Sequence, residues 1–356
     1  MNEILMYVMA FGALLGGVDQ ICGNRLGFGR RFEEAFRLLG PIALSMAGII
    51  CLAPLLSGVL GYVIVPVFDA LKLDPGMFGS ILAIDMGGYQ MAMDLCRDGE
   101  MGRFSGIIVS AIFGCTVVFT IPVGLGTMEA ADRHWFIRGI LMGLGSIPLG
   151  LMIGGVAMGL PLGQLLWNCL PIFAVCGLLF WGLVKAADRM LTLFQRFAKG
   201  IQALATLGLT AGAIAYMTGW QIPRMIPLEE AMEVVCSIAI VMLGSMPLAE
   251  LIQRVLKTPF AWIGARTGLN STSTTGILIG MVSVMPALAM IPRMDKRGKM
   301  VNGAFVVCGA SAFTAHLGFC LSTQPDLAGA LLASKLLGGL GAVILALTLT
   351  RDLRGQ

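Results

Sequence analysis

The sequence contains few charged side chains and almost no histidine. Only 12% of its 356 residues are charged and two are histidines, whereas 57% are hydrophobic. A soluble domain ordinarily has roughly 25% charged residues, because water must solvate its surface. The shortage of charge excludes a soluble fold, and the abundance of apolar side chains excludes a disordered chain. The protein is therefore predicted to lie in a membrane.

The motifs of enzymes, metal sites and nucleic-acid binding are also missing. There is no His-Glu-x-x-His, no Gly-x-Ser-x-Gly and no phosphate-binding loop, and Gly27-Phe28-Gly29 lacks the rest of a dinucleotide fingerprint. The nine cysteines include no Cys-x-x-Cys pair. The net charge of +4 is small and is best assigned to loops at the membrane surface. We therefore expect no enzymatic activity, no metal or other cofactor, and no nucleic-acid partner.

Long apolar segments are what the chain has in abundance. A helix needs about 20 apolar residues to cross a bilayer core. Eleven segments approach this length without the strict alternation of barrel strands. They are Ile4–Cys22, Leu38–Leu60, Pro75–Cys96, Phe104–Thr127, Trp135–Gly159, Leu162–Val184, Ile201–Gly219, Val234–Ile252, Ser271–Pro292, Val301–Thr323 and Leu327–Thr350. The sequence thus predicts an all-α polytopic membrane protein embedded in the lipid bilayer.

Two shorter apolar pieces, Tyr62–Leu71 and Val255–Ala265, are ambiguous by length. Basic residues concentrate in cytoplasmic loops, and here they form four groups. The groups are Arg25/Arg30/Arg31, Lys185/Arg189/Arg196/Lys199, Arg293/Lys296/Arg297/Lys299 and Arg351/Arg354. If both short pieces cross, all four groups lie inside and the N-terminus lies outside, whereas if neither crosses, the groups are split between the faces. We therefore predict thirteen crossings, eleven long and two short.

An internal repeat becomes visible when the chain is shifted by 196 residues. The shift aligns, besides several apolar residues, Glu33-Glu34-Ala35 with Glu229-Glu230-Ala231, and Gly48 with Gly244. Under the thirteen-crossing topology, repeat one (residues 1–159) and repeat two (201–350) have opposite orientations and are joined by residues 160–200. Inverted repeats are typical of secondary transporters, which bind substrate near the midplane, where broken helices meet. We predict a single transmembrane domain of this kind.

Helix-breaking residues indicate two breaks at corresponding places of the repeats. They are Asp74-Pro75-Gly76 with Asp85-Met86-Gly87-Gly88, and Gly268–Thr275, which includes Asn270, with Ser283-Val284-Met285-Pro286. Irregular backbone at membrane depth is tolerated only around a cavity or within protein. Asp85 lies midway along an apolar segment, where a charge costs at least ~2.5–3.5 kcal/mol, so we interpret it as a counter-ion for a cation or as a proton carrier. A paired structural carboxylate is the alternative, and Gly87 and Gly88 beside it would let a ligand approach the backbone.

Other polar residues in or near the apolar segments allow two interpretations each. Lys335 either pairs with Asp85 or extends to a lipid headgroup. His316 either binds substrate or relays protons, or it is a hydrogen-bonded packing residue. We predict a loop at Glu129, Asp132, Arg133 and His134, and helix packing by the glycines between Gly139 and Gly163, many of them four residues apart.

Five stretches are more specific than general membrane composition. They are Met77–Gly88, Phe119–Gly126 with Asp132-Arg133, Met294–Asn302, His316–Phe319 and Lys335–Gly339. In this order they resemble the bacterial ethanolamine permease family, and the resemblance extends over nearly the whole chain. It implies uptake of ethanolamine, a small amino alcohol that is a cation at neutral pH, across the bacterial inner (cytoplasmic) membrane, without a cofactor.

Residue by residue, the resemblance implies a substrate site that contains Asp85, Gly87 and Gly88. It extends further to Asn270, Asn302, His316 and Lys335. We expect Asp85 to face the ammonium group of the substrate, because an unpaired buried charge is costly. We expect His316, Ser283 or Asn302 to contact the hydroxyl group.

The chain departs from the family's pattern at two places. Ser283-Val284 stand where the family has two asparagines before the proline, and Ala315 stands where the family has an acidic residue before the histidine. Losing an acid and two amides should weaken recognition of an ammonium group, so a different small amine remains an alternative substrate. A membrane subunit that senses an amine without moving it and a channel-like facilitator are alternative functions. A homo-oligomer is compatible with the sequence.

Overall fold

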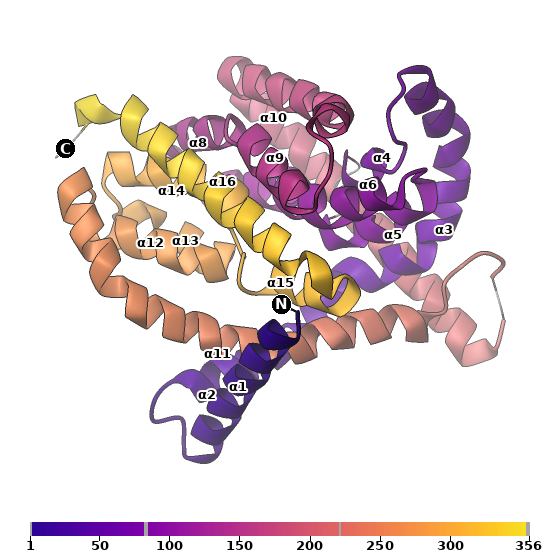
Figure 1. Ribbon diagram of the computed structural model, residues 1–356, viewed down its shortest axis with the longest axis horizontal. Coiled ribbons are helices and arrows are strands. Elements are labelled where there is room, and N and C mark those ends of the chain that lie inside the picture. The colour runs from indigo at the N-terminus through magenta and orange to yellow at the C-terminus, as the bar shows by residue number, and fades with distance from the viewer. Residues whose placement is uncertain (1, 82–84, 221, 354–356) are drawn as a thin grey trace.

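The computed structural model describes residues 2–81, 85–220 and 222–353, without the side chains of Asn2, Ile81 and Asp85. Within these residues every regular element is a helix (Figure 1). The N-terminal half contains α1 Asn2–Ile21, α2 Phe28–Arg37, α3 Leu39–Ala70, α4 Met77–Ile81, η1 Asp85–Gly87, α5 Gly88–Leu95, α6 Gly99–Arg103, η2 Phe104–Gly114, η3 Thr116–Thr120, α7 Ile121–Thr127, α8 Ala130–Leu144 and α9 Ile147–Ala157. The C-terminal half contains α10 Leu162–Thr218, α11 Leu228–Thr267, α12 Ser271–Val282, α13 Val284–Met290, η4 Ile291–Arg293, α14 Lys296–Gly309, α15 Ala315–Thr323, η5 Pro325–Leu327, α16 Ala328–Leu349 and η6 Arg351–Leu353. The segments η2 and η3 are π-helices, and the other η segments are 3-10 helices.

Seven helical stretches in the described part of the chain are long and apolar enough to cross a membrane. They are Glu3–Ile21, Phe28–Ala70, Gly99–Thr127, Ala130–Ala157, Leu162–Thr218, Leu228–Thr267 and Pro325–Leu349. A helix satisfies its backbone hydrogen bonds internally, as the bilayer core requires. The prediction of an all-α, multi-pass membrane protein is confirmed. The predicted eleven long helices are not confirmed, and the differences have identifiable physical causes.

The apolar segment Pro75–Cys96 folds back on itself and does not form one long helix. Its two helices, α4 and α5, lie side by side so closely that a Cβ on Gly79 would come within 2.6 Å of the Ala92 nitrogen. At the base of the segment, the Asp98 nitrogen donates a hydrogen bond to Asp74 Oδ2 at 2.8 Å. Because the two ends are bound together, the chain enters and leaves on one side. We call this segment hairpin one, and the prediction of a spanning helix here is wrong.

The segment Ser271–Pro292 folds back in the same way. Its helices α12 and α13 are separated by Ser283, whose φ of −151° and ψ of 131° are extended and not helical. At the base, the Asn270 nitrogen donates to Asp295 Oδ1 at 3.0 Å, which binds the two ends together. We call this segment hairpin two. The prediction that Ser271–Pro292 forms a spanning helix is therefore wrong as well.

The bases of the two hairpins lie at opposite ends of α16. The helix α6 follows hairpin one, and its Arg103 forms an ion pair with Asp326, just before α16 begins. The helix α14 follows hairpin two, and its Arg297 Nη2 donates to the Leu347 carbonyl at 2.8 Å, in the last turn of α16. With 22 residues, α16 is about 33 Å long, close to the thickness of a bilayer core. The hairpins therefore enter the helical bundle from opposite ends.

The two short apolar pieces are not separate spans. Tyr62–Leu71 forms the end and C-cap of the 32-residue α3, and Val255–Ala265 lies within the 40-residue α11. No helix break separates either piece from the span before it, so the prediction that they cross on their own is wrong. The longest helix, α10, does have a break. Ala186, with φ −152° and ψ 54°, divides its 57 residues into two helices.

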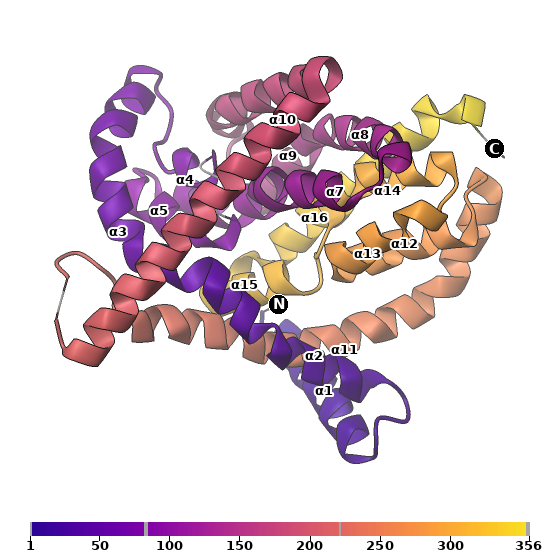
Figure 2. The ribbon, with the colours of Figure 1, turned by 180° about the vertical axis from the view of Figure 1, so that it is seen from behind.

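Two helix crossings depend on pairs of glycines. A Cβ on Gly208 of α10 would lie 2.0 Å from the Gly48 carbonyl oxygen of α3, and a Cβ on Gly12 of α1 would lie 2.3 Å from the Gly244 carbonyl oxygen of α11. Figure 2 shows α10 running diagonally past α3, and Figure 1 shows α11 passing α1 and α2. Small residues allow this close approach of two backbones within a membrane.

A single methyl group at the α1–α11 crossing should destabilise the protein. A Cβ on Gly244 would lie 2.0 Å from the Met9 carbonyl oxygen, so we expect Gly244→Ala to lower the free energy of unfolding by about 1–3 kcal/mol. Gly177→Ala in α10 is the matched control, because no atom lies within 4 Å of its Cβ position. Thermal unfolding in detergent compares the two variants with the parent. Equal stability of both variants would contradict the tight crossing.

The glycines between Gly139 and Gly163 were predicted to serve helix packing, and several of them do so. A Cβ on Gly139 of α8 would lie 2.3 Å from the Met300 carbonyl oxygen of α14, and one on Gly154 of α9 would lie 2.9 Å from Ser334 Oγ of α16. These glycines thus allow close packing of α8 on α14 and of α9 on α16.

Candidate functional site

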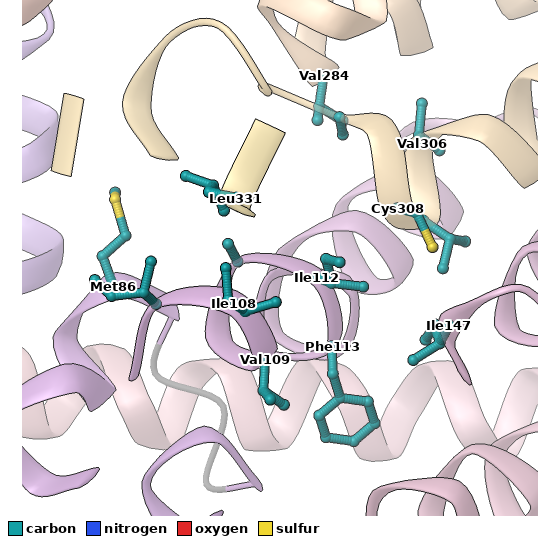
Figure 3. Packing of buried hydrophobic residues seen from close by; sticks show 14 of the residues in the cluster. Met86, Ile108, Val109, Ile112, Phe113, Ile147, Val284, Val306, Cys308 and Leu331 are labelled. Atoms are coloured by element: carbon teal, nitrogen blue, oxygen red, sulfur yellow. The ribbon is translucent and has the colours of Figure 1, made fainter. Parts of the chain in front are cut away.

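The tip of hairpin one reaches a buried segment, the π-helix η2, and Val284 at the tip of hairpin two lies in the same buried cluster as η2. All 11 residues of η2 are buried. Met86 in η1, Val284 at the start of α13 and Ile108 of η2 belong to one buried cluster, and Figure 3 shows Leu331 of α16 next to Ile108. Irregular helical turns of the π type frequently occur at functional sites. Two helix breaks and a π-helix thus contribute to one buried cluster, and broken helices near the midplane are where secondary transporters often bind substrate.

Lys335 of α16 places a charged side chain against η2. It is 1% exposed, and its Nζ donates a hydrogen bond to the Ala111 carbonyl of η2 at 2.7 Å. A side chain that extends to a lipid headgroup would place its ammonium group at the surface. That alternative is wrong, because the ammonium group of Lys335 lies inside the bundle. A buried ammonium group attracts a negative charge placed nearby more strongly than it would in water, because the dielectric constant of the interior is low.

A second helix break brings the start of α15, with His316, close to the end of α12, with Ser283. The helices α14 and α15 are interrupted at residues 310–314, and the Ser311 nitrogen donates to the Gly280 carbonyl at 2.9 Å, while Thr314 Oγ1 donates to the Val282 carbonyl at 2.5 Å. These bonds satisfy carbonyls at the end of α12, directly before Ser283. His316, which is 3% exposed, lies in the first turn of α15 that follows this break.

Asn302 and Asn270 lie near the base of hairpin two and not at its tip. Asn302 Nδ2 donates to the carbonyls of Ser273 and Gly298, each at 2.9 Å. Asn270 is exposed, and its Oδ1 caps α12 by accepting from the Ser273 nitrogen at 2.8 Å. The 12 residues of α12, about 18 Å, separate this cap from Ser283. The structure therefore does not place Asn270 together with Ser283 and His316.

At the tip of hairpin one, Gly88 has a packing contact and a polar neighbour. A Cβ on Gly88 would lie 2.6 Å from the Gly79 carbonyl oxygen and 3.7 Å from Ser110 Oγ of η2. Gly87 beside it is buried. The side chain of Asp85, the predicted counter-ion, lies outside the described part of the structure.

Ser110 is a candidate that sequence reasoning missed. Its side chain is 1% exposed, and its Oγ has no hydrogen-bond partner among the residues that the structure describes. It precedes Ala111, whose carbonyl binds Lys335. A buried hydroxyl without a hydrogen-bond partner costs free energy unless a ligand or a water molecule forms a hydrogen bond with it. Serines are common in apolar helices, so the sequence carries no signal that separates this one from a packing residue.

Four ion pairs of the described residues join the N-terminal half of the chain to the C-terminal half, and two of them lie beside the hairpin bases. Arg103 pairs with Asp326 beside the base of hairpin one, and Lys299 pairs with Asp132 beside the base of hairpin two. Arg103 Nε also donates to Gln324 Oε1 at 2.9 Å. Gln324 Nε2 in turn donates to the Tyr89 hydroxyl of α5 at 2.6 Å. Each hairpin base is thus held to the opposite half of the chain by charge.

The prediction of a loop at Asp132, Arg133 and His134 is wrong, because α8 begins at Ala130. The side chains of Asp132 and Lys299 are only 10% and 12% exposed. The two residues are 167 positions apart in the sequence, so the pairing that permits burial cannot be inferred from local spacing. Glu129 is the residue directly before the helix.

The described residues hold no group of three or more His, Cys, Asp or Glu side chains that could bind a metal ion. The polar groups at the centre are hydroxyls, a histidine, a lysine and backbone carbonyls. Such groups can bind a small polar molecule by hydrogen bonds and charge.

The chain is similar to known proteins over its whole length. It matches the model of the family described as ethanolamine utilisation protein, EutH, over residues 1–349. It is 38% identical to probable ethanolamine permease EutH of Listeria monocytogenes over 344 residues, covering 96% of this chain and 92% of that protein. It is 37% identical to uncharacterized protein YxeR of Bacillus subtilis over 351 residues and 36% identical to probable ethanolamine permease EutH of Escherichia coli strain K12 over 388 residues, in both cases covering 98% of this chain and 95% of the relative. No solved structure matches the chain.

Proposed function

The chain belongs to the family of the ethanolamine utilisation protein EutH, and from this premise we propose that it carries ethanolamine, or a close small amino alcohol, across the bacterial inner membrane. Two of the relatives above bear the name probable ethanolamine permease. Ethanolamine is a compact cation with one hydroxyl group. Hydroxyls and backbone carbonyls such as those described above could bind so small a molecule by hydrogen bonds, and we propose that Asp85 supplies a carboxylate for its ammonium group.

We propose nine crossings and two hairpins that enter the membrane without crossing it. The seven long helical stretches become eight crossings when α10 is divided at Ala186, and α14 with α15 adds the ninth. With the N-terminus outside, the basic groups at Arg25–Arg31, Lys185–Lys199 and Arg293–Lys299, and Arg351 at the end of the chain, all lie on the cytoplasmic side. The agreement of four separate groups with one face supports this topology.

We propose further that residues 1–159 and 201–350 are inverted repeats joined by residues 160–200. The shift of 196 residues relates Gly12 of one crossing to Gly208 of the other, and Gly48 to Gly244. It also relates the start of α5 to the start of α13. It relates Asp74, whose Oδ1 accepts from the Gly76 nitrogen two residues on, to Asn270, whose Oδ1 accepts from the Ser273 nitrogen three residues on. Equivalent helix boundaries, side-chain hydrogen bonds and close contacts at one constant offset support a common repeat.

The transport proposal is supported chiefly by two hairpins that enter from opposite ends and whose tips lie in one buried cluster. Broken helices near the midplane, contributed by two inverted halves, are typical of secondary transporters. Each hairpin base is exposed to a different side of the membrane. Movement of either half against the other would therefore open the centre to one side at a time.

We propose that Asp85 is the counter-ion of the substrate's ammonium group and, in its absence, of Lys335. Exchange of one ammonium partner for another would keep the carboxylate neutralised throughout the cycle, since an unpaired buried charge is costly. Gly87 and Gly88 would contribute backbone groups, and Ser110, Ser283 and His316 would bind the hydroxyl. Asn302 and Asn270 would stabilise the base of hairpin two through their hydrogen bonds.

Purified protein in proteoliposomes tests the function directly. A carrier is expected to exchange external labelled ethanolamine for unlabelled ethanolamine trapped inside, so that the label transiently exceeds its equilibrium level. Binding in a fixed ratio to protein, without entry into the vesicles, would instead indicate a sensor. Entry that never exceeds equilibrium would indicate a channel-like facilitator, and exchange only with a different amine would change the substrate.

A further inference from the structure

A basic cavity lies where the C-terminal ends of α11 and α16 meet α14. Its volume is about 460 Å³, and it is lined by Arg266, Thr267, Arg297, Leu347, Thr348 and Arg351. Three of these residues are arginines and none is acidic. A volume of this size lies within the range of small-ligand sites, roughly 300–1,000 Å³. The cavity is thus large enough for a small anion or a lipid headgroup.

One of the three guanidinium groups holds the two helix ends together. Arg297 is 4% exposed, and its Nε donates to Thr350 Oγ1 at 3.1 Å. Its other nitrogens donate to the Leu347 carbonyl at 2.8 Å and to the Thr267 carbonyl. Carbonyls in the last turn of a helix carry partial negative charge, so Arg297 neutralises the ends of α16 and α11. The base of the cavity is therefore rigid and built by the fold.

The other two arginines add positive charge around the opening. The Arg266 guanidinium lies 3.9 Å from the centre of the Trp262 ring, which fixes its position by a cation–π contact. Trp262 is 57% exposed and Ile263 beside it is 44% exposed. Exposed tryptophan next to arginine is typical of the level of lipid headgroups. Arg351 is exposed at the start of η6.

We propose that this cavity binds a phosphate group, and that an anionic phospholipid of the inner leaflet supplies it. Guanidinium groups bind phosphate oxygens through two parallel hydrogen bonds. Basic pockets between helices on the cytoplasmic side are suited to anionic headgroups. The cytoplasmic location of the cavity rests on the proposed topology, but the binding chemistry does not.

Phosphate binding here would act on hairpin two. Thr267, which lines the cavity, lies three residues before Asn270, the capping residue at the hairpin base. A bound phosphate that draws Arg266 and Arg351 together would fix the end of α11 relative to α16. The base of hairpin two would then be held in one position while its tip remains free to respond to substrate.

The test measures thermal unfolding of the purified full chain in neutral detergent, without reference to transport. The probes are phosphatidylglycerol, phosphatidylcholine with the same acyl chains but no net charge, and inorganic phosphate. The variant is Arg266→Gln with Arg351→Gln, which leaves Arg297 and the helix ends intact. Arg196→Gln is the matched control, because Arg196 is an exposed arginine of another cytoplasmic basic group.

Phosphatidylglycerol is expected to raise the unfolding temperature of the parent and of Arg196→Gln by several degrees more than phosphatidylcholine does. In the double variant we expect at least half of this difference to be lost. If inorganic phosphate alone gives the same shift, and the double variant loses it, the site stands but its ligand is a soluble phosphate. Equal shifts in the parent and the double variant would overturn the proposal. Because no substrate is present, failure here leaves the proposed transport function untouched.

Discussion

Replacing Asp85 by asparagine is expected to reduce ethanolamine uptake at least about 30-fold, because it would remove the carboxylate of the proposed ammonium pair. Truncating one partner of a buried charge pair costs roughly 2–5 kcal/mol, and each 1.4 kcal/mol is a factor of ten. The amide is close to the carboxylate in size but cannot neutralise an ammonium group. Initial rates of labelled ethanolamine uptake, normalised to the amount of protein in the membrane, measure the effect.

Two controls separate loss of the counter-ion from general damage. Asp188→Asn removes a carboxylate whose side chain is 92% exposed, and it should leave uptake unchanged. Asp85→Glu keeps the charge and should retain part of the activity. If Asp85→Asn transports ethanolamine as well as the parent, Asp85 is not the counter-ion.

Replacing Asp132 by leucine is expected to lower the free energy of unfolding by about 3–5 kcal/mol, because Lys299 would be left with a poorly solvated charge. Lys299→Leu should lower the free energy of unfolding by a similar amount, because the carboxylate of Asp132 would be left without its partner. Combining both changes removes both charges and should recover most of the loss, since well-packed apolar residues often replace a buried ion pair without penalty. Thermal unfolding of the four proteins gives the interaction energy of the pair.

Asp188→Leu is the matched control, because its ion pair with Arg133 has an N–O distance of 3.8 Å and is largely exposed. Exposed pairs contribute about 0–1 kcal/mol. Simple addition of the two single effects in the Asp132 and Lys299 double variant would show that the residues do not act as a pair.

Composition and apolar run length were sufficient to predict a multi-pass helical membrane protein. They could not distinguish a spanning helix from a hairpin, because both need about 20 apolar residues. What folds Pro75–Cys96 back is the hydrogen bond between Asp74 and the Asp98 nitrogen, together with the contact of Gly79 with Ala92. Neither interaction is encoded in hydropathy. The same holds for Asp132, which is buried by a partner distant in the sequence.

The sequence indicated some residues of the candidate site and not others, for a physical reason. A charged residue such as Lys335 stands out in an apolar chain because its burial is costly, and Ser283 stands out because Pro286 follows it closely within an apolar segment. Ser110 does not stand out, since a serine can satisfy itself within its own helix. Its importance depends on a π-helix that hydropathy does not reveal and on the neighbouring Ala111 carbonyl that receives Lys335.

Uptake of labelled ethanolamine at about pH 5.5 and about pH 8, into cells that produce the protein, is the measurement that distinguishes a carrier of this amine from a protein that does not move it. At the acid pH almost all of a primary amine is protonated, so diffusion of the neutral form through lipid becomes negligible. If the protein carries ethanolamine, we expect saturable uptake at both pH values that exceeds the level in cells without the protein. Uptake at acid pH no greater than in those cells would contradict it, and the departures at Ser283, Val284 and Ala315 would then direct the search for the true substrate.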